Sequence, residues 1–188
     1  MSKLEVDAIE PQSGTTLTLG ASGDTVNIAS GATNNLGITE ADQFRLTADI
    51  SNPSGDISSN LERVDDATFA KIGTGMTESS GIYTFPSTGL YLVTLITQTT
   101  AISDAAMVVT MQSSSNSGTS YDDIANSISG IASGSINVTM SIGTFVNVTN
   151  ASTFRVKFAS SSFANGTLKG DTSKTETGFT FIRLGDSQ

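Results

Sequence analysis

The chain has 188 residues, a formal net charge of −9, and only 14% charged residues. Its nine lysines and arginines are scattered, which argues against a nucleic-acid partner, because binding a phosphate backbone requires clustered basic side chains. The absence of cysteine excludes disulfides and thiolate metal sites. Abundant Ser, Thr, Gly and Asn, combined with Val, Ile and Leu, favour an all-β chain.

Residues 1–37 form a distinct N-terminal segment. "TTLTLGASGD" and "TVNIASGATN" are two successive units, each predicted as a short alternating strand that ends in a Ser-Gly or Gly-Ala turn. Two such strands bury too little surface to be stable alone. We therefore predict that this segment is an attachment or stem element, with a floppy arm as the alternative. The apolar residues expected to make the attachment are Leu4, Val6, Ile9, Leu17, Leu19, Val26 and Ile28.

Residues 38–188 are predicted to form a second domain, built from short strands that turn residues separate. No helical period is sustained, so we predict an antiparallel two-sheet sandwich. The expected strands are Phe44–Ile50, Leu61–Val64, Phe69–Ile72, Ile82–Phe85, Leu90–Thr99, Met107–Gln112, Ser120–Gly130, Ser135–Val148, Thr153–Ala159, Thr167–Gly170 and Gly178–Leu184.

The segment "IYTFPSTGLYLVTLITQ" reads as a hairpin. Pro86 cannot donate to a ladder and should end the first strand. Gly89 is free to take a positive φ in the turn. The strand from Leu90 opens without alternation, which suggests that both of its faces are buried. Such a strand must be central in its sheet or must lie against a neighbouring subunit.

This hairpin resembles the signature hairpin of the complement globular head, in the tumour-necrosis-factor-like jelly-roll superfamily. The matching positions are Gly81, Tyr83, Phe85, Pro86, Gly89 and Tyr91. "QFRLTADIS", "SINVTMSIGTFVNVTNASTFRVKF" and "TGFTFIRL" resemble further strands of that family in the same order. The chain departs from the family at "VTNASTF", where a Gly-Asp turn is frequent. The resemblance implies a jelly roll over about 43–184.

The opening "SKLEVDAIEPQSGTTLTLGASGDTVNIASGA" resembles the start of virion proteins of tailed phages that infect marine cyanobacteria. Together the two resemblances imply a phage tail-fibre-like protein, with an N-terminal attachment segment and a jelly-roll knob. The implied location is the virion. The sequence also lacks a secretory signal and any long apolar run, so we expect synthesis in the host cytoplasm and no membrane insertion.

We expect a homotrimer. The jelly-roll family is characteristically three-fold symmetric, and a chain without disulfides gains stability by closing cyclically with its own copies. Tyr83, Phe85, Tyr91 and Val93 are candidates for the three-fold interface, with the core of a single subunit as the alternative.

Catalysis is not expected, because the chain has no histidine and no cysteine. Paired carboxylates could act as acid and base or hold Ca²⁺, but Asp65/Asp66 and Asp122/Asp123 are adjacent pairs that point to opposite faces of a strand. We interpret these residues, and Glu62, as solvated loop carboxylates. We predict no cofactor and no metal.

Loops rich in Ser, Asn and Gly could instead bind a host-surface glycan or protein, with Tyr121 and Phe163 as the stacking side chains. Three functions therefore stay open. The first is a homotrimeric virion fibre knob that is joined to other virion proteins through residues 1–37. The second is a purely architectural decoration, collar or tail-joining protein. The third is a carbohydrate-binding or carbohydrate-active protein outside a virion.

Overall fold

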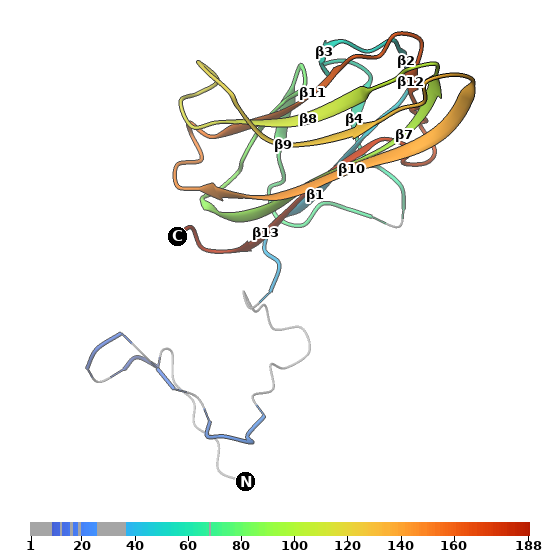
Figure 1. Cartoon of the computed structure of the whole chain (residues 1–188). Coiled ribbons are helices and arrows are strands. Elements are labelled where there is room, and N and C mark those ends of the chain that lie inside the picture. Colours follow the sequence, from blue (N-terminus) through green and yellow to red (C-terminus); the bar gives the residue numbers. More distant parts are fainter. Residues whose placement is uncertain (1–8, 12, 16, 19, 26–36, 68) are drawn as a thin grey trace. The chain divides into compact units, whose positions relative to one another are not determined.

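The structure is a computed structural model, which describes residues 9–11, 13–15, 17–18, 20–25, 37–67 and 69–188 (Figure 1). The chain divides into two compact units, Met1–Asn34 and Asn35–Gln188. We call the second the sandwich unit. Over the described residues, no helix is long and apolar enough to cross a membrane.

In the N-terminal unit, the described residues include a tight turn but no strand. Asp24 N donates to Ala21 O at 3.0 Å, while Ala21 N donates to Asp24 Oδ2 at 2.7 Å. The predicted Ser-Gly turn is therefore confirmed. Leu17 is described and lies outside any strand, so the strand expected there is wrong at that position. Val26 and Ile28 lie outside the described residues.

Thirteen strands form in the described part of the sandwich unit, and all the pairings between them are antiparallel. They are β1 (Ala41–Leu46), β2 (Ile50–Ser51), β3 (Gly55–Asp56), β4 (Leu61–Arg63), β5 (Thr77–Ser79), β6 (Ile82–Thr84), β7 (Gly89–Ile102), β8 (Met107–Ser114), β9 (Asp122–Ser129), β10 (Ser135–Val148), β11 (Arg155–Ser161), β12 (Thr167–Leu168) and β13 (Gly178–Gly185).

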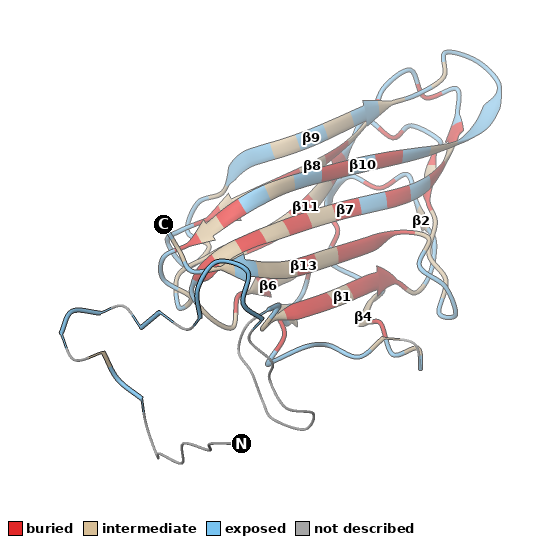
Figure 2. Ribbon diagram, turned by 90° about the horizontal axis from the view of Figure 1, so that it is seen from below, coloured by how far each residue is buried: buried red, intermediate tan, exposed pale blue. Residues whose placement is uncertain are grey.

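The strands build two packed sheets, as the sequence predicts. The seven-stranded sheet has the order β2-β12-β7-β13-β1-β4, and β10 pairs with the other edge of β7. The six-stranded sheet has the order β5-β6-β11-β8-β9, with β3 beside β11. Figure 2 shows β10, β7, β13 and β1 side by side, with buried and exposed residues alternating along β7 and β10.

The core between the sheets is aromatic at its centre. The ring of Tyr83 lies 5.1 Å from that of Phe44, 5.8 Å from that of Phe158 and 4.9 Å from that of Phe181, measured between centroids. These rings come from β6, β1, β11 and β13, so they join both sheets. Tilted and edge-on aromatic contacts of this kind add stability beyond the area that they bury.

The hairpin around Pro86 forms as predicted, with one difference. β6 ends at Thr84, before the proline, and Gly89 has a φ of 153°. However, β7 alternates along its whole length: Tyr91, Val93 and Leu95 are buried, whereas Leu90 and Leu92 are only half-buried. The prediction that both faces of its start are buried is therefore wrong for a single subunit. β7 is central in its sheet.

The prediction also fails at several short elements. Phe69–Ile72 is not a strand; Ile72 makes one isolated bridge with Ala41, after which Gly73 turns the chain away with a φ of 73°. β3 and β5 were not predicted, since "GD" and "TES" carry no apolar pattern.

Candidate subunit interface

The four residues expected at a three-fold axis point into the subunit's own core. Tyr83, Phe85, Tyr91 and Val93 are each at most 2% exposed in a single chain. The core alternative is therefore the correct one, because these side chains fill the space between the two sheets. A subunit interface must use other residues.

The outward face of the seven-stranded sheet carries an apolar row. Leu92 on β7 is directly opposite Phe145 on β10 and Ile182 on β13, and directly paired side chains lie on the same face of a sheet. Phe145 is 62% exposed, and Leu92 and Ile182 are half-buried. We call Ile182, Leu92 and Phe145 the apolar row.

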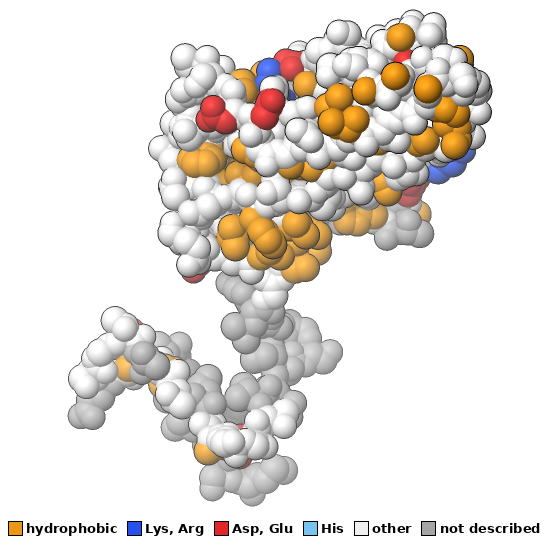
Figure 3. All heavy atoms as spheres, in the orientation of Figure 1, with side chains coloured by type: hydrophobic (Ala, Val, Ile, Leu, Met, Phe, Trp, Pro, Cys, Tyr) orange, Lys and Arg blue, Asp and Glu red, His pale blue; other side chains and the backbone are white. Residues whose placement is uncertain are grey.

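Further apolar side chains surround this row. Leu90 precedes it on the outward face of β7, and Leu184 follows Ile182 beyond a break in register and is exposed. Figure 3 shows hydrophobic side chains gathered on the lower side of the sandwich unit, where Figure 1 has β10 and β13. Contiguous exposed apolar surface of this kind marks a contact site.

β10 adds to this surface a sheet edge without a ladder partner in the described part of the chain. It pairs with β7 over all fourteen of its residues and, among the described strands, with no other. Its sequence "SINVTMSIGTFVNV" contains neither a charged residue nor a proline. Exposed edge strands in natural proteins usually carry such residues, which prevent pairing with other chains. The edge of β10 therefore favours a covering partner.

The acidic residues considered for catalysis or Ca²⁺ hold a buried arginine instead. Arg45 is 1% exposed; its Nε donates to Glu62 at 2.7 Å, Nη1 to Asp66 at 2.8 Å and Nη2 to Asp65 at 2.9 Å. Burial alone lowers the pKa of Arg45, but the hydrogen bond to Glu62 and the charge of Asp66 outweigh it and raise that pKa. The interpretation as solvated carboxylates fails for Glu62 and Asp66, which are half-buried, and holds for Asp65, whose side chain is 77% exposed.

A second arginine network lies on the inward side of β1, the strand that carries Arg45. Arg63 Nε donates to Asp42 Oδ1 at 2.9 Å, and Asp42 Oδ2 also accepts from Met76 N at 2.7 Å. Among the described residues, no group of three or more acidic side chains is arranged to hold a metal ion. Asp122 and Asp123 stay exposed on β9.

The two stacking candidates are not free surface aromatics. Phe163 is 8% exposed and packs in the core, so its prediction as a receptor contact is wrong. Tyr121 is half-buried, and Lys157 Nζ lies 4.4 Å from the centre of its ring, so the lysine covers one face of that ring.

The expected attachment residues fall mostly outside the described part of the chain. Ile9 and Leu17 are described, and both are exposed. Leu4, Val6, Leu19, Val26 and Ile28 lie outside it. Their role stays a prediction.

Comparisons with known proteins reveal similarity in three dimensions only. The chain resembles the structure of Eiger TNF from S. frugiperda, with a TM-score of 0.62, 11% identity, and coverage of 79% of this chain and 94% of that one. It also resembles murine APRIL at pH 8.0, with a TM-score of 0.57, 12% identity, and coverage of 77% and 98%. The fold is a tumour-necrosis-factor-like jelly roll. No family model matches the sequence, and no curated protein does.

Within this jelly roll, the sequence reasoning found two apolar faces at the start of β7 but did not name Leu92, Phe145 and Ile182 as an outward row. The signal was present, since Leu90 and Leu92 alternate with Tyr91 and Val93, and Phe145 alternates with Val146. Both registers are apolar in these stretches, so the pattern alone does not reveal which of them faces the core.

Proposed function

We propose that this protein is a homotrimeric virion knob, in which the jelly rolls contact one another through the apolar row and the part of the β10 edge next to Phe145. The observation that carries the proposal is Phe145, a large aromatic side chain that is 62% exposed at the β10 end of the apolar row. Burying it on a neighbouring copy removes that surface from water. Three-fold closure is supported by the fold, whose family is characteristically trimeric.

The virion role rests on the N-terminal segment. Residues 1–37 resemble the opening of phage structural proteins, and we propose that they join the knob to other virion proteins while the jelly roll presents its loops to the host surface. The exposed side chains of Ile9 and Leu17 are compatible with such a contact.

An architectural role is the second candidate, and one observation favours it. Phe163 is buried and Tyr121 is capped by Lys157, so neither expected receptor aromatic is free. A decoration, collar or joining protein needs no receptor contact. A carbohydrate-binding or carbohydrate-active protein outside a virion is the third possibility carried by the sequence.

The first experiment is the native mass of the purified full chain by light scattering over a range of concentrations. We expect about three times 19.4 kDa. A stable monomer at micromolar concentration would contradict the trimer.

The second experiment is co-fractionation with virions. The full chain should stay with the particles through a high-salt wash, whereas a chain that begins at Ile38 should not join them. Normal incorporation of the shortened chain would contradict attachment through residues 1–37. Loss of host adsorption by particles that lack the knob would favour the receptor role over the architectural one.

A further inference from the structure

A second feature lies on the outward face of the seven-stranded sheet, farther along β7 than the apolar row. It is an open groove of about 270 Å³ between β7, β10 and the loop before β13. Ile96 and Gln98 lie four and six residues beyond Leu92, about 13 and 20 Å away at about 3.3 Å per residue. The groove is lined by Ile96, Thr97, Gln98, Asn137, Val138, Thr139, Thr175 and Glu176.

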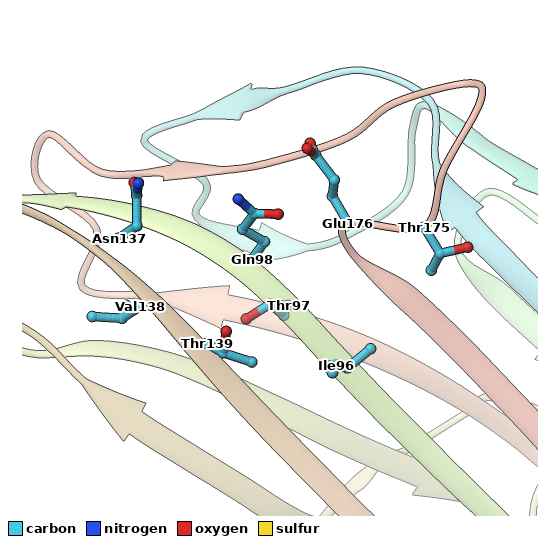
Figure 4. Close-up of a pocket in the computed structure, with 8 residues that line it drawn as sticks. All are labelled: Ile96, Thr97, Gln98, Asn137, Val138, Thr139, Thr175 and Glu176. Atoms are coloured by element: carbon cyan, nitrogen blue, oxygen red, sulfur yellow. The ribbon is translucent and has the colours of Figure 1, made fainter.

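The side chains of the groove converge. Figure 4 shows Gln98 between Asn137 and Glu176, with all three side chains rising on the same side of the sheet. Thr139 is the direct cross-strand partner of Gln98. Ile96, which is 49% exposed, adds an apolar surface next to these polar groups.

Most of these polar groups are uncommitted. The amide of Gln98 and the hydroxyls of Thr139 and Thr175 make no side-chain hydrogen bond with another described residue. Asn137 Oδ1 accepts from Thr100 Oγ1 at 3.0 Å, which leaves its NH₂ group available. Glu176 Oε1 lies 2.6 Å from Lys174 Nζ, which leaves Oε2 available.

The walls of the groove are held by the backbone. Gln98 N donates to Glu176 O at 2.9 Å, and Leu46 N donates to Thr177 O at 3.0 Å. The buried Arg45 donates to Thr172 O, which fixes the start of the same loop. Binding therefore requires little ordering of the protein, which favours affinity.

The lining selects a chemical class. Two amides, two hydroxyls and a carboxylate offer both donors and acceptors, which matches hydroxyl groups, since each of these can donate and accept. Glu176 disfavours an anion, and its pairing with Lys174 removes most of the attraction for a cation. Ca²⁺ requires six to eight oxygen ligands, more than one carboxylate and a few amides and hydroxyls provide here.

We infer that this groove binds a neutral saccharide, with Gln98, Asn137 and Glu176 contacting sugar hydroxyls and Ile96 packing against the apolar face of the ring. The inference deepens the host-binding part of the proposed function, and it moves the glycan contact from Tyr121 and Phe163 to the outward face of β7 and β10. The groove is formed by one subunit, so its binding does not require virion attachment.

The test is an NMR titration of the ¹⁵N-labelled full chain with D-glucose, D-galactose, D-mannose and N-acetyl-D-glucosamine. We expect at least one of these sugars to give saturable shifts of the side-chain amide signals of Gln98 and Asn137, with millimolar affinity. N-acetylneuraminic acid, which carries a carboxylate, should leave these signals unchanged. No shift with any neutral sugar at hundred-millimolar concentration, or equal shifts with the anionic sugar, would overturn the inference.

Matched variants locate the contact. Gln98→Ala and Asn137→Ala should weaken binding about tenfold or more. Asn126→Ala, which removes an exposed asparagine on β9 of the other sheet, should leave binding unchanged. Equal loss in all three variants would overturn the assignment to the groove.

The native mass of each variant separates this inference from the proposed function. If the chain binds sugar but is a monomer, the saccharide site is supported and the homotrimer of the proposed function is contradicted. If the chain is a trimer but binds no sugar, the homotrimer is supported and the saccharide site is contradicted.

Discussion

The outward face of the seven-stranded sheet is apolar at one end of β7 and polar at the other. Along the outward side of β7, Leu90 and Leu92 lie at one end and Gln98 and Thr100 at the other. The inward side does not change in the same way: Tyr91, Val93, Leu95, Thr97, Thr99 and Ala101 are all buried. The inward side of the strand is therefore constrained by the fold, while the outward side is divided between an exposed apolar row and a polar groove.

The largest effect is expected at the apolar end. Phe145→Ser should dissociate the proposed trimer, because three exposed phenylalanines are lost, each contributing about 1.5–3 kcal/mol when buried, or about 5–9 kcal/mol per trimer. Sedimentation equilibrium measures the change. Ile128→Ser is the control, since Ile128 is also 62% exposed but lies on β9 in the other sheet. A Phe145→Ser protein with the parent mass at micromolar concentration would contradict the assigned interface.

Substitutions of two leucines on β7 distinguish its inward face from its outward face. Leu95→Ala should lower the free energy of unfolding by about 2–5 kcal/mol, because Leu95 is buried between the sheets. Leu92→Ala should cost clearly less in the same subunit and should act mainly on assembly. The two substitutions are compared by urea unfolding in the Phe145→Ser background at one protein concentration, so that subunit assembly does not add to the free energy of unfolding. Equal costs would place Leu92 in the core.

Acid should weaken the loops at the polar end, which a buried carboxylate holds in place. Asp104 is buried; its Oδ1 accepts from Asn165 N at 3.0 Å and from Ala164 N, and its Oδ2 accepts from Ile102 N at 2.9 Å. Burial alone raises the pKa of Asp104, but these three backbone N–H groups outweigh it and lower that pKa below 3.8.

Because the folded-state pKa is lowered, the stabilisation is present above the ordinary value near 3.8 and is lost as the pH falls through the folded-state value. The free energy of unfolding, measured from neutral pH down to about pH 2, should show this loss. In Asp104→Asn the acid-induced loss should be smaller, and the free energy of unfolding at neutral pH should be lower by about 1–3 kcal/mol. Asp122→Asn, at an exposed position on β9, should leave the pH profile unchanged. A parental acid profile in Asp104→Asn would contradict the role of Asp104.

The smallest effects concern two tyrosines of the core. The hydroxyl of Tyr83 is buried without a hydrogen-bond partner in the described structure, whereas the Tyr91 hydroxyl donates to Ser87 O at 3.1 Å. Tyr83→Phe should therefore be neutral or stabilising by up to about 1 kcal/mol, and Tyr91→Phe should cost about 1 kcal/mol. Thermal unfolding of both variants checks the sign. A larger loss in Tyr83→Phe than in Tyr91→Phe would indicate a partner for Tyr83.

Much of the fold could be predicted because its signals are local. The bounds of β10 agree with the predicted Ser135–Val148, since turn residues flank a long run rich in β-formers. Pro86 and Gly89 placed the hairpin correctly for the same reason. β3 and β5 could not be found in this way, because strands of two and three residues are held by their neighbours in the sheet.

The sites were less predictable. Tyr83 and Tyr91 belong to the hairpin that resembles the complement globular head, and that resemblance does not reveal whether they face the core or a neighbouring subunit. Phe163 lies in a Ser- and Asn-rich loop typical of a surface, but its side chain is buried. The carboxylates of Asp65 and Asp66 bind Arg45, twenty or more positions earlier in the chain, and no local pattern reveals such a pairing.

By itself the sequence determined that this chain is all-β, where most of its strands and turns lie, and that β7 carries apolar side chains on two faces at its start. Alternation and turn chemistry are properties of neighbouring residues, so they can be read along the chain. Only the tertiary structure decided that Tyr91 faces inward and Leu92 outward, and that Gln98, Asn137 and Glu176 meet in one groove. Those outcomes depend on which face packs against the second sheet and on strands that are distant in sequence.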